Sequence, residues 1–212
     1  MNFDYVIIGN SAAGIGCAET LRELTDSSIA VISYEKYPYS RALIPYYLDG
    51  KIEFDKLYYR PLNFYERLNI EALLGKKAVK VDFRNKEVLL DDGERIGYNK
   101  LLIATGGKPF IPPIEGLEKQ NNVFTFVKLD DALGIKERLD TKSVEKVVVL
   151  GGGIIGLMAG KILGRRAKVT LITPTSRILV RAVDKIASQL VINKFIENGV
   201  EIVLNTTIKK VV

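Results

Sequence analysis

The sequence predicts an α/β protein with two three-layer domains, each built around a parallel sheet, the second of them incomplete. Two observations lead to this prediction. A buried-strand pattern runs into a glycine-rich turn and a helix at residues 5–24, and the same pattern returns at residues 147–163. Aligning Gly9 with Gly151 requires no gap through the turn. A chain of 212 residues that is 47% hydrophobic is long enough for one large or two small domains.

The first repeat reads as a βαβ unit. Residues 5–8, Tyr-Val-Ile-Ile, are a continuous apolar run typical of a buried strand. They lead into the turn 9–14, Gly-Asn-Ser-Ala-Ala-Gly, and we expect a helix from there to about Leu24. A second apolar strand is expected at residues 29–33.

The second repeat follows the same order. Residues 147–150 form the apolar strand, and residues 151–156, Gly-Gly-Gly-Ile-Ile-Gly, form the turn. We expect a helix to about Leu163 and a strand at 169–173. The chain therefore contains the same supersecondary unit twice.

The spacing of the glycines has a physical cause. The first allows the tight turn, the second lets the backbone approach a pyrophosphate, and the third lets helix and strand pack closely. A diphosphate then lies on the N–H groups at the helix N-terminus. Each turn thus predicts a Rossmann-like, dinucleotide-binding domain of the β-β-α or α-β-α kind. Ser11 replaces the middle glycine of the first turn, where its hydroxyl either donates to a phosphate or marks a loosened site. A plain strand-to-helix turn is the alternative reading of both.

Composition excludes several kinds of site. The chain has no histidine and one cysteine, Cys17, which rules out a histidine triad, a histidine metal site, an internal disulfide and a cysteine metal cluster. The net charge of +6 is scattered in short basic pairs, which argues against nucleic-acid binding. It suits phosphate-bearing cofactors and an acidic protein partner equally well.

The location expected from the sequence is cytoplasmic. No stretch approaches the roughly 18 uninterrupted apolar residues of a membrane helix, and the start Met-Asn-Phe-Asp lacks the basic residues of a secretory signal. No membrane partner is expected.

Two dinucleotide turns imply two dinucleotides, and the simplest chemistry that needs both is hydride transfer between a nicotinamide and a flavin. At these residues the sequence resembles the FAD-dependent pyridine nucleotide oxidoreductases. It is most similar to the branch of NADH oxidases, coenzyme A disulfide reductases, ferredoxin and rubredoxin reductases, and the FAD portion of nitrite reductase large subunits. The resemblance covers essentially the whole chain. It includes residues 98–116, YNKLLIATGGKPFIPPIEG, which are similar to the second FAD signature, and residues 53–82 before them.

The resemblance implies an FAD site on the first repeat. Glu35, 26 positions after Gly9, is expected to bind the adenosine ribose, and an exposed loop charge is its alternative. Arg41 is expected to place a positive charge near the flavin or the pyrophosphate, and a solvated surface arginine is its alternative. The remaining FAD residues that it implies are Gly9, Ser11, Ala12, Ala13, Gly14, Thr105 and Gly106.

The resemblance also implies that this chain lacks the redox cysteine of the disulfide-reducing members. Ala42 stands where disulfide-reducing members place their redox cysteine, and without a thiolate coenzyme A disulfide reduction at this position is excluded. Cys17 lies on the helix after the first turn, where a buried small side chain is expected. Flavin-centred electron transfer to an outside acceptor remains, and no side chain need act as a catalytic acid or base.

The nicotinamide unit departs from the family pattern twice. Gly151, Gly153, Ile155 and Gly156 are implied at the pyrophosphate, but Met158 and Thr173 stand where relatives carry acids. A 2′-phosphate would instead meet Thr173, Thr175, Ser176 and Arg177, so the expected substrate is NAD(P)H. The alternative is a second site that binds its nucleotide weakly or not at all.

The expected domains are residues 1–110 for the FAD-binding part, 111–144 for a connection, and 145–212 for the incomplete NAD(P)H-binding part. Because family members continue beyond this length, we expect a fragment or one subunit of a split enzyme, completed by a missing domain, a partner subunit or a homodimer. The predicted function is an FAD-dependent NAD(P)H oxidoreductase that passes electrons to oxygen, a small molecule or an acidic redox protein. A non-catalytic, degenerate nucleotide-binding subunit is the alternative.

Overall fold

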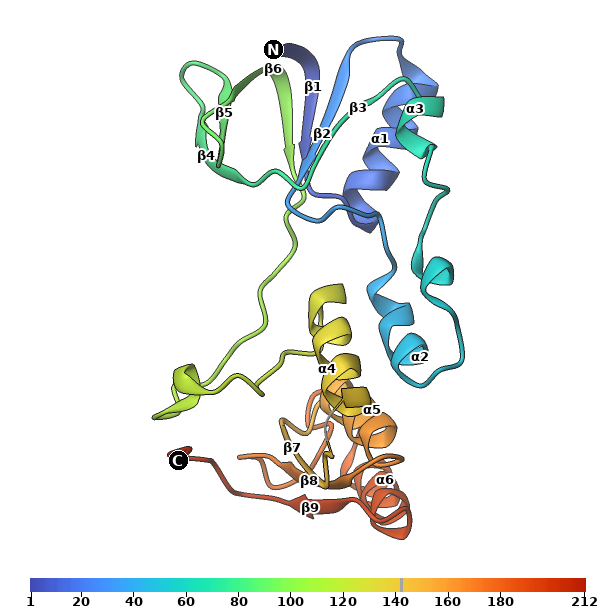
Figure 1. Ribbon diagram of the computed structural model, residues 1–212, viewed down its shortest axis with the longest axis vertical. Coiled ribbons are helices and arrows are strands. Elements are labelled where there is room, and N and C mark those ends of the chain that lie inside the picture. Colours follow the sequence, from blue (N-terminus) through green and yellow to red (C-terminus); the bar gives the residue numbers. More distant parts are fainter. Residues whose placement is uncertain (142) are drawn as a thin grey trace. The chain divides into compact units, whose positions relative to one another are not determined.

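The computed structural model describes residues 1–141 and 143–212, and the chain divides into two compact units (Figure 1). Unit 1 comprises Met1–Ser40 and Asp55–Lys108, and unit 2 comprises Arg41–Phe54 and Pro109–Val212. The domain boundaries expected from the sequence include residues 41–54 in the FAD-binding part, residues 1–110. The structure instead packs this segment with unit 2.

Unit 1 is organised around a six-stranded sheet in the order β3-β2-β1-β6-β5-β4. β1, β2, β3 and β6 run parallel to one another, whereas β5 runs antiparallel to β6 and to β4. The strands are β1 Asn2–Ile8, β2 Ile29–Ser33, β3 Glu71–Leu74, β4 Ala78–Asp82, β5 Glu87–Leu90 and β6 Arg95–Ile103.

β2 and the carboxyl half of β1 are buried on both faces of the sheet. Successive side chains of a strand point to opposite faces, so Val6 and Ile8 enter one core and Ile7 enters the other. The first core is completed by the β4–β5 hairpin, and the second by helices α1 Ala12–Leu24 and α3 Phe64–Arg67 (Figure 1). Helices, central strands and hairpin form the three layers predicted for the first domain.

Unit 2 contains a three-stranded parallel sheet in the order β7-β8-β9. Its core joins the sheet to the helix that follows β7, to the helix that follows β8 and to one helix that precedes the sheet. The elements are α4 Leu129–Thr141, β7 Lys146–Leu150, α5 Ile154–Leu163, β8 Lys168–Ile172, α6 Lys185–Glu197 and β9 Glu201–Val203.

β7 is an edge strand of this sheet. Val149 packs into the core, whereas Val148 and Leu150 are 55% and 41% exposed. Covering exposed apolar side chains and an unpaired strand edge with another element lowers the free energy of the protein. The β7 edge is therefore an open side of this sheet within the described part of the chain.

The segment Arg41–Phe54 is held to unit 2 by its own side chains. It contains a 3-10 turn, Arg41–Leu43, and helix α2 Ile44–Leu48, whose Leu48 packs against the core of unit 2. The Asp49 carboxylate accepts from Lys51 at 2.9 Å and from Arg165, which follows α5. These contacts account for the assignment of the segment to unit 2.

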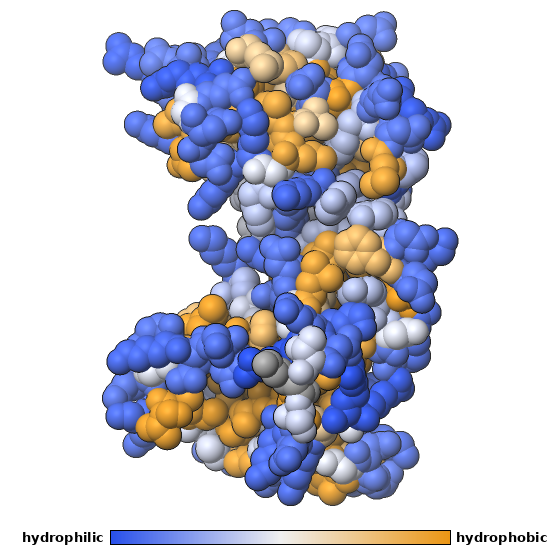
Figure 2. All heavy atoms as spheres, viewed as in Figure 1, coloured by the Kyte–Doolittle hydropathy of each residue, from blue (hydrophilic) through white to orange (hydrophobic). Residues whose placement is uncertain are grey.

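The visible surface is largely hydrophilic, with apolar patches between the charged side chains (Figure 2). None of the helices in the described part of the chain combines the length and the apolar character needed to cross a membrane.

Candidate functional site

The first glycine-rich turn begins at Gly9, where β1 ends. Gly9 has φ of +127° and donates its N–H to Ile32 O of β2 at 2.9 Å. A Cβ on Gly9 would lie 2.2 Å from the Ala104 carbonyl oxygen, just after β6. Only glycine fits this position, because both the backbone conformation and the space exclude a side chain.

The last glycine of each turn allows the helix to approach the strand. A Cβ on Gly14 would lie 1.9 Å from the Gly9 carbonyl oxygen, and a Cβ on Gly156 would lie 1.9 Å from that of Gly151. Gly151 itself has φ of +115° and donates its N–H to Ile172 O at 2.8 Å. The two turns therefore repeat the same geometry at the carboxyl end of a parallel strand.

Helices α1 and α5 begin without the groups that normally satisfy a helix N-terminus. Neither has an acidic residue in its first turn, and the N-cap residues Ser11 and Gly153 make no side-chain capping bond. Helix α6, in contrast, is capped by Asp184, which accepts from the Ala187 N–H at 2.8 Å. The backbone N–H groups and the positive dipole end of α1 and α5 therefore suit an anion such as a pyrophosphate.

The N-cap residues of α1 and α5 differ in how much space they leave at the start of the helix. A Cβ on Gly153 would meet nothing within 4 Å, so the approach to the start of α5 is open. Ser11 carries a side chain at the equivalent place in unit 1 and is half-buried. Ala12 and Ala13 follow it, exposed on the first turn of α1, as Ile155 is on the first turn of α5. Ala12 and Ala13 in unit 1, and Gly153 and Ile155 in unit 2, are thus exposed at the start of their helix.

Asn10 is a residue of the first turn that the sequence did not single out. It is 2% exposed, and its Oδ1 accepts a hydrogen bond from the Tyr65 hydroxyl of α3. Its Nδ2 is buried, with no acceptor among the described residues. A buried amide of this kind is a position at which a bound polar group lowers the free energy.

The strand end of β6 adjoins the first turn. Ala104 donates its N–H to Ile8 O at 2.8 Å, which brings Thr105 and Gly106 to the same sheet edge as Gly9. Both are exposed, and Gly106 has φ of +65°. Thr105, Gly106 and the turn 9–14 thus lie at one end of the strands in unit 1, and their contact with FAD stays a prediction.

Glu35 lies two residues beyond β2. Its carboxylate accepts from the Tyr39 hydroxyl at 2.7 Å and from the Tyr34 hydroxyl at 3.3 Å, and its N–H donates to Ser33 Oγ at 3.1 Å. The side chain is half-buried and held by this tyrosine pair, so it is not a loose surface charge. Its position after the second strand suits a ribose contact, which remains a prediction.

Arg41 belongs to unit 2. Its guanidinium donates to the Val127 carbonyl oxygen at 3.2 Å, in the segment that precedes α4. The Asp131 carboxylate accepts from the N–H groups of Val127 and Lys128 and from the Thr125 hydroxyl. Arg41 therefore has a contact with this segment, and its role near a flavin stays a prediction.

The strand end of β8 holds the residues predicted to meet the adenosine ribose. Thr173 is 3% exposed, and its hydroxyl shares a hydrogen bond with the Thr175 hydroxyl at 2.9 Å. The Arg177 guanidinium donates to backbone carbonyls of its own loop. Gly152 of the second glycine-rich turn packs against this loop.

The two positions that bear on thiol chemistry lie apart in the chain. Ala42 is exposed on the 3-10 turn of unit 2. Cys17 lies on α1 and packs against the core of unit 1, where burial raises the pKa of its thiol. A raised pKa disfavours the nucleophilic thiolate, in keeping with a packing role.

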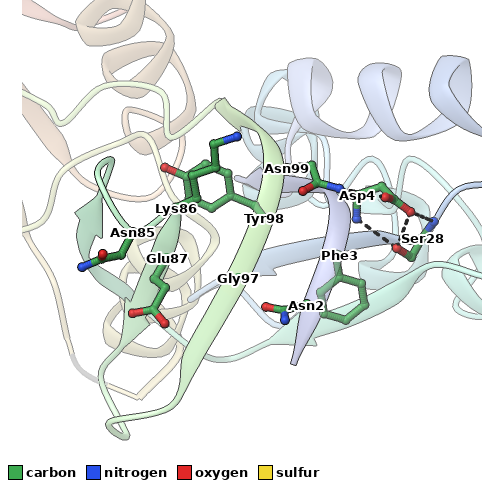
Figure 3. Close-up of a pocket in the computed structure, with 10 residues that line it drawn as sticks. All are labelled: Asn2, Phe3, Asp4, Ser28, Asn85, Lys86, Glu87, Gly97, Tyr98 and Asn99. Carbon is green, nitrogen blue, oxygen red and sulfur yellow. Dashed lines mark hydrogen bonds between the residues drawn. The ribbon is translucent and has the colours of Figure 1, made fainter.

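A hollow of about 480 Å³ lies elsewhere in unit 1 (Figure 3). It is lined by the first residues of β1 and by Gly97, Tyr98 and Asn99 of β6, at the end of the strands opposite the glycine-rich turn. The Asp4 carboxylate there accepts from Ser28 and Asn99, and the Ser28 hydroxyl lowers its pKa. Ligands of parallel sheets bind at the carboxyl ends, so this hollow is not the candidate site.

The residues present fit an FAD in unit 1. The glycine cradle at Gly9 and Gly14, the uncapped start of α1 and the unpartnered Asn10 amide all lie at one edge of the sheet. Unit 2 repeats the cradle and the uncapped helix. The fold and these turns define a protein with two dinucleotide-binding units of Rossmann type.

Comparison with known proteins gives the family. The model of the pyridine nucleotide-disulphide oxidoreductase family matches residues 3–212, and the chain belongs to this family. It is 32% identical to an NADH oxidase of Methanocaldococcus jannaschii, with 98% of this chain and 48% of the relative covered. It is 32% identical to rubredoxin-NAD(+) reductase of Pseudomonas putida, with 97% of this chain and 54% of the relative covered.

A solved structure agrees with these relatives. The covalent complex of putidaredoxin reductase with putidaredoxin matches with a TM-score of 0.88 and 30% identity, over 97% of this chain and 50% of that chain. The predicted α/β fold and the predicted family are both confirmed. The chain spans about half the length of the curated relatives it matches, 48% and 54% for the two above.

Proposed function

We propose that the protein is an FAD-dependent NAD(P)H oxidoreductase. The observation behind the proposal is the repeated cradle: Gly9 with Gly14 in unit 1, and Gly151 with Gly156 in unit 2, each at an uncapped helix. A protein that binds one dinucleotide needs one such cradle. Two cradles in a member of this family support FAD in unit 1 and a nicotinamide dinucleotide in unit 2.

The chain's own contribution is binding and orientation. Amides of the first turn and α1 hold the FAD pyrophosphate, and Glu35 accepts from the adenosine ribose. Bound FAD supplies the centre that takes a hydride from the nicotinamide and passes electrons on. No side chain is assigned as a catalytic acid or base. The other FAD-binding residues proposed are Ser11, Ala12, Ala13, Arg41, Thr105 and Gly106, and those for the nicotinamide dinucleotide are Gly151, Gly153, Ile155 and Gly156.

The acceptor is proposed to lie outside the chain, because Ala42 offers no thiol. An acidic redox protein is one candidate, and oxygen or a small molecule is the other. The relatives include proteins named as an NADH oxidase and as a rubredoxin reductase. Unit 2 has 18 basic and 12 acidic residues, whereas unit 1 has 13 of each, so unit 2 carries the whole net charge of +6. Such an imbalance favours docking of an acidic partner and of phosphates.

We further propose that turnover requires polypeptide that covers the open side of unit 2. The exposed Val148 and Leu150 of the edge strand β7 support this. A further domain, a partner subunit and a second copy of the chain are the three candidates.

An anaerobic titration tests the proposed reaction. Purified protein should be yellow with an absorption band near that of oxidised FAD, and one equivalent of NADH or NADPH should bleach it. A protein that binds no FAD when FAD is supplied in excess would contradict the flavoprotein assignment. Bound FAD that neither nicotinamide reduces would contradict the role of unit 2.

The second candidate function is a non-catalytic nucleotide-binding module. Met158 and Thr173, which stand where the family resemblance implies acids, favour it. The two candidates differ in one measurement, because a module that has lost nicotinamide binding would retain FAD and resist bleaching.

A further inference from the structure

The loop after β8, residues 173–184, packs against the second glycine-rich turn. The Leu179 N–H donates to the Gly152 carbonyl oxygen at 2.7 Å. A Cβ on Gly152 would lie 3.1 Å from Ile178 Cγ2 and 3.2 Å from Thr173 Cγ2. The position of this loop therefore decides the shape of the turn on which a nicotinamide dinucleotide would lie.

The backbone of the loop is strained where it meets the turn. Leu179 has φ of +53°, a left-handed conformation that residues with side chains rarely adopt. Surrounding contacts must hold it there. One of them is the Ser188 hydroxyl of α6, which donates to the Ile178 carbonyl oxygen at 2.9 Å.

Arg177 adds three hydrogen bonds within the loop. Its Nη1 donates to the carbonyl oxygens of Val183 at 2.6 Å and Asp184 at 3.3 Å, and its Nη2 donates to that of Val180 at 3.1 Å. The planar guanidinium thus bridges three carbonyls of its own loop, with the hydrogen-bonding strength of a charged donor. In this arrangement both terminal nitrogens face the loop's own backbone.

A nicotinamide site distinguishes NADH from NADPH through charge. An acid that accepts from the ribose 2′-hydroxyl favours NADH, and a cation that meets the 2′-phosphate favours NADPH. The end of β8 has Thr173, which is buried and bonded to Thr175, in place of an acid. The nearby Asp184 carboxylate caps α6 through the Ala187 N–H.

We propose that Arg177 is a positioning residue that holds the loop against Gly152, and that unit 2 consequently binds NAD and NADP with affinities within about tenfold of each other. The inference rests on the proposed binding of a nicotinamide dinucleotide to unit 2. It goes beyond that function because it replaces the 2′-phosphate role first expected of Arg177.

Calorimetric titration of the oxidised, FAD-loaded protein with NAD⁺ and NADP⁺ tests the inference without requiring turnover. Dissociation constants within about tenfold of each other are the expected result. A preference beyond tenfold for either nucleotide would overturn it. If neither nucleotide binds, nucleotide binding by unit 2 is itself wrong, and that pattern separates failure of the proposed function from failure of the inference.

Three substitutions distinguish a positioning role of Arg177 from direct binding of the 2′-phosphate. Arg177→Ala should weaken NAD⁺ and NADP⁺ by the same factor, about fivefold or more, because the loop loses its preorganised shape. Arg177→Lys should not restore binding, since one ammonium cannot bridge three carbonyls. If Arg177 instead contacted the 2′-phosphate directly, Arg177→Ala would weaken only NADP⁺ binding and Arg177→Lys would restore it. That result would overturn the inference.

Arg181→Ala is the matched control, since Arg181 is an exposed cation of the same loop. It should leave the ratio of the two affinities unchanged. A loss of NADP⁺ binding alone in this variant would show that a cation of the loop discriminates, and the inference would be wrong. The wild-type affinity ratio decides the question even if the Arg177 variants do not fold.

Discussion

The Tyr65 hydroxyl donates a hydrogen bond to Asn10 Oδ1 within unit 1. Tyr65 is 6% exposed and Asn10 is 2% exposed, and 55 positions separate them in the chain. The bond links helix α3 to the first glycine-rich turn. A buried pair at this place couples the packing of the helix layer to the shape of the proposed FAD cradle.

Tyr65→Phe should lower the free energy of unfolding by about 1–3 kcal/mol, because the buried Asn10 Oδ1 loses its donor. Urea unfolding followed by circular dichroism measures this. Tyr37→Phe, which removes the hydroxyl of an exposed tyrosine, is the matched control and should change little. Equal effects of the two substitutions would contradict a specific role of the Tyr65 bond.

The same tyrosine predicts a loss of stability in alkali. Burial raises the pKa of Tyr65 well above its ordinary value of 10.0. The folded state therefore keeps a proton that the unfolded state releases above about pH 10, so stability is constant below that pH and falls as the pH rises beyond it. Thermal unfolding between pH 8 and 11 should show this decline. The decline should be smaller in Tyr65→Phe, and an unchanged pH dependence would assign it to other groups.

Gly153 and Gly156 should respond differently to the same added methyl group. Gly156→Ala should destabilise unit 2 by about 2–3 kcal/mol or more, since the Cβ would lie 1.9 Å from the Gly151 carbonyl oxygen. Gly153→Ala meets no protein atom within 4 Å, so its folding cost should stay below about 1 kcal/mol. Its NAD⁺ affinity should nevertheless fall, because the methyl group enters the space proposed for the pyrophosphate. Melting curves and calorimetry on both variants separate packing from binding, and full NAD⁺ affinity in Gly153→Ala would reject the proposed site.

The ion pair between Arg165 and Asp49 should hold the segment Arg41–Phe54 in place. Arg165→Ala should cost about 1 kcal/mol, a modest figure because the arginine is half exposed. Limited proteolysis should then cut residues 41–54 faster. Arg166→Ala, which removes the adjacent pairing to Asp140, is the control and should leave cleavage of this segment unchanged.

Acid should loosen the same segment. The Lys51 hydrogen bond and the neighbouring Arg165 charge lower the pKa of Asp49 below its ordinary value of 3.8. The stability that this carboxylate contributes is therefore present above about pH 4 and lost as the pH falls through the lowered pKa. Proteolysis with pepsin at pH 2 to 4 measures the change. Asp49→Asn should show rapid cleavage at every pH in this range, and protection in that variant would contradict the role of the charge.

Local pattern was enough to predict the elements of the repeat. The first helix ends at Leu24 and the second at Leu163, as expected, and the strand Ile29–Ser33 has the predicted bounds. β8 begins and ends one residue earlier than expected. Apolar runs and glycine spacing act within about 20 residues, so such features can be read from the sequence without the fold.

The hydrogen-bond partners of individual side chains could not be predicted from local pattern. The sequence predicts Arg177 near a 2′-phosphate, and no local pattern reveals that its guanidinium donates to the carbonyl oxygens of Val180, Val183 and Asp184 in its own loop. Asn10 was passed over because nothing in the turn reveals its bond to Tyr65. A residue type indicates which donors exist, but only the folded backbone decides which acceptor each one reaches.

The sequence by itself determined that this chain carries two glycine-rich βαβ units, since these depend on the order of neighbouring residues. Only the tertiary structure decided that residues 41–54 pack with unit 2, because Asp49 and Arg165 meet across 116 positions. It also decided which helix N-termini stay uncapped. The physical reason is that contacts between segments distant in sequence depend on the tertiary packing of the whole chain, and local propensity does not determine that packing.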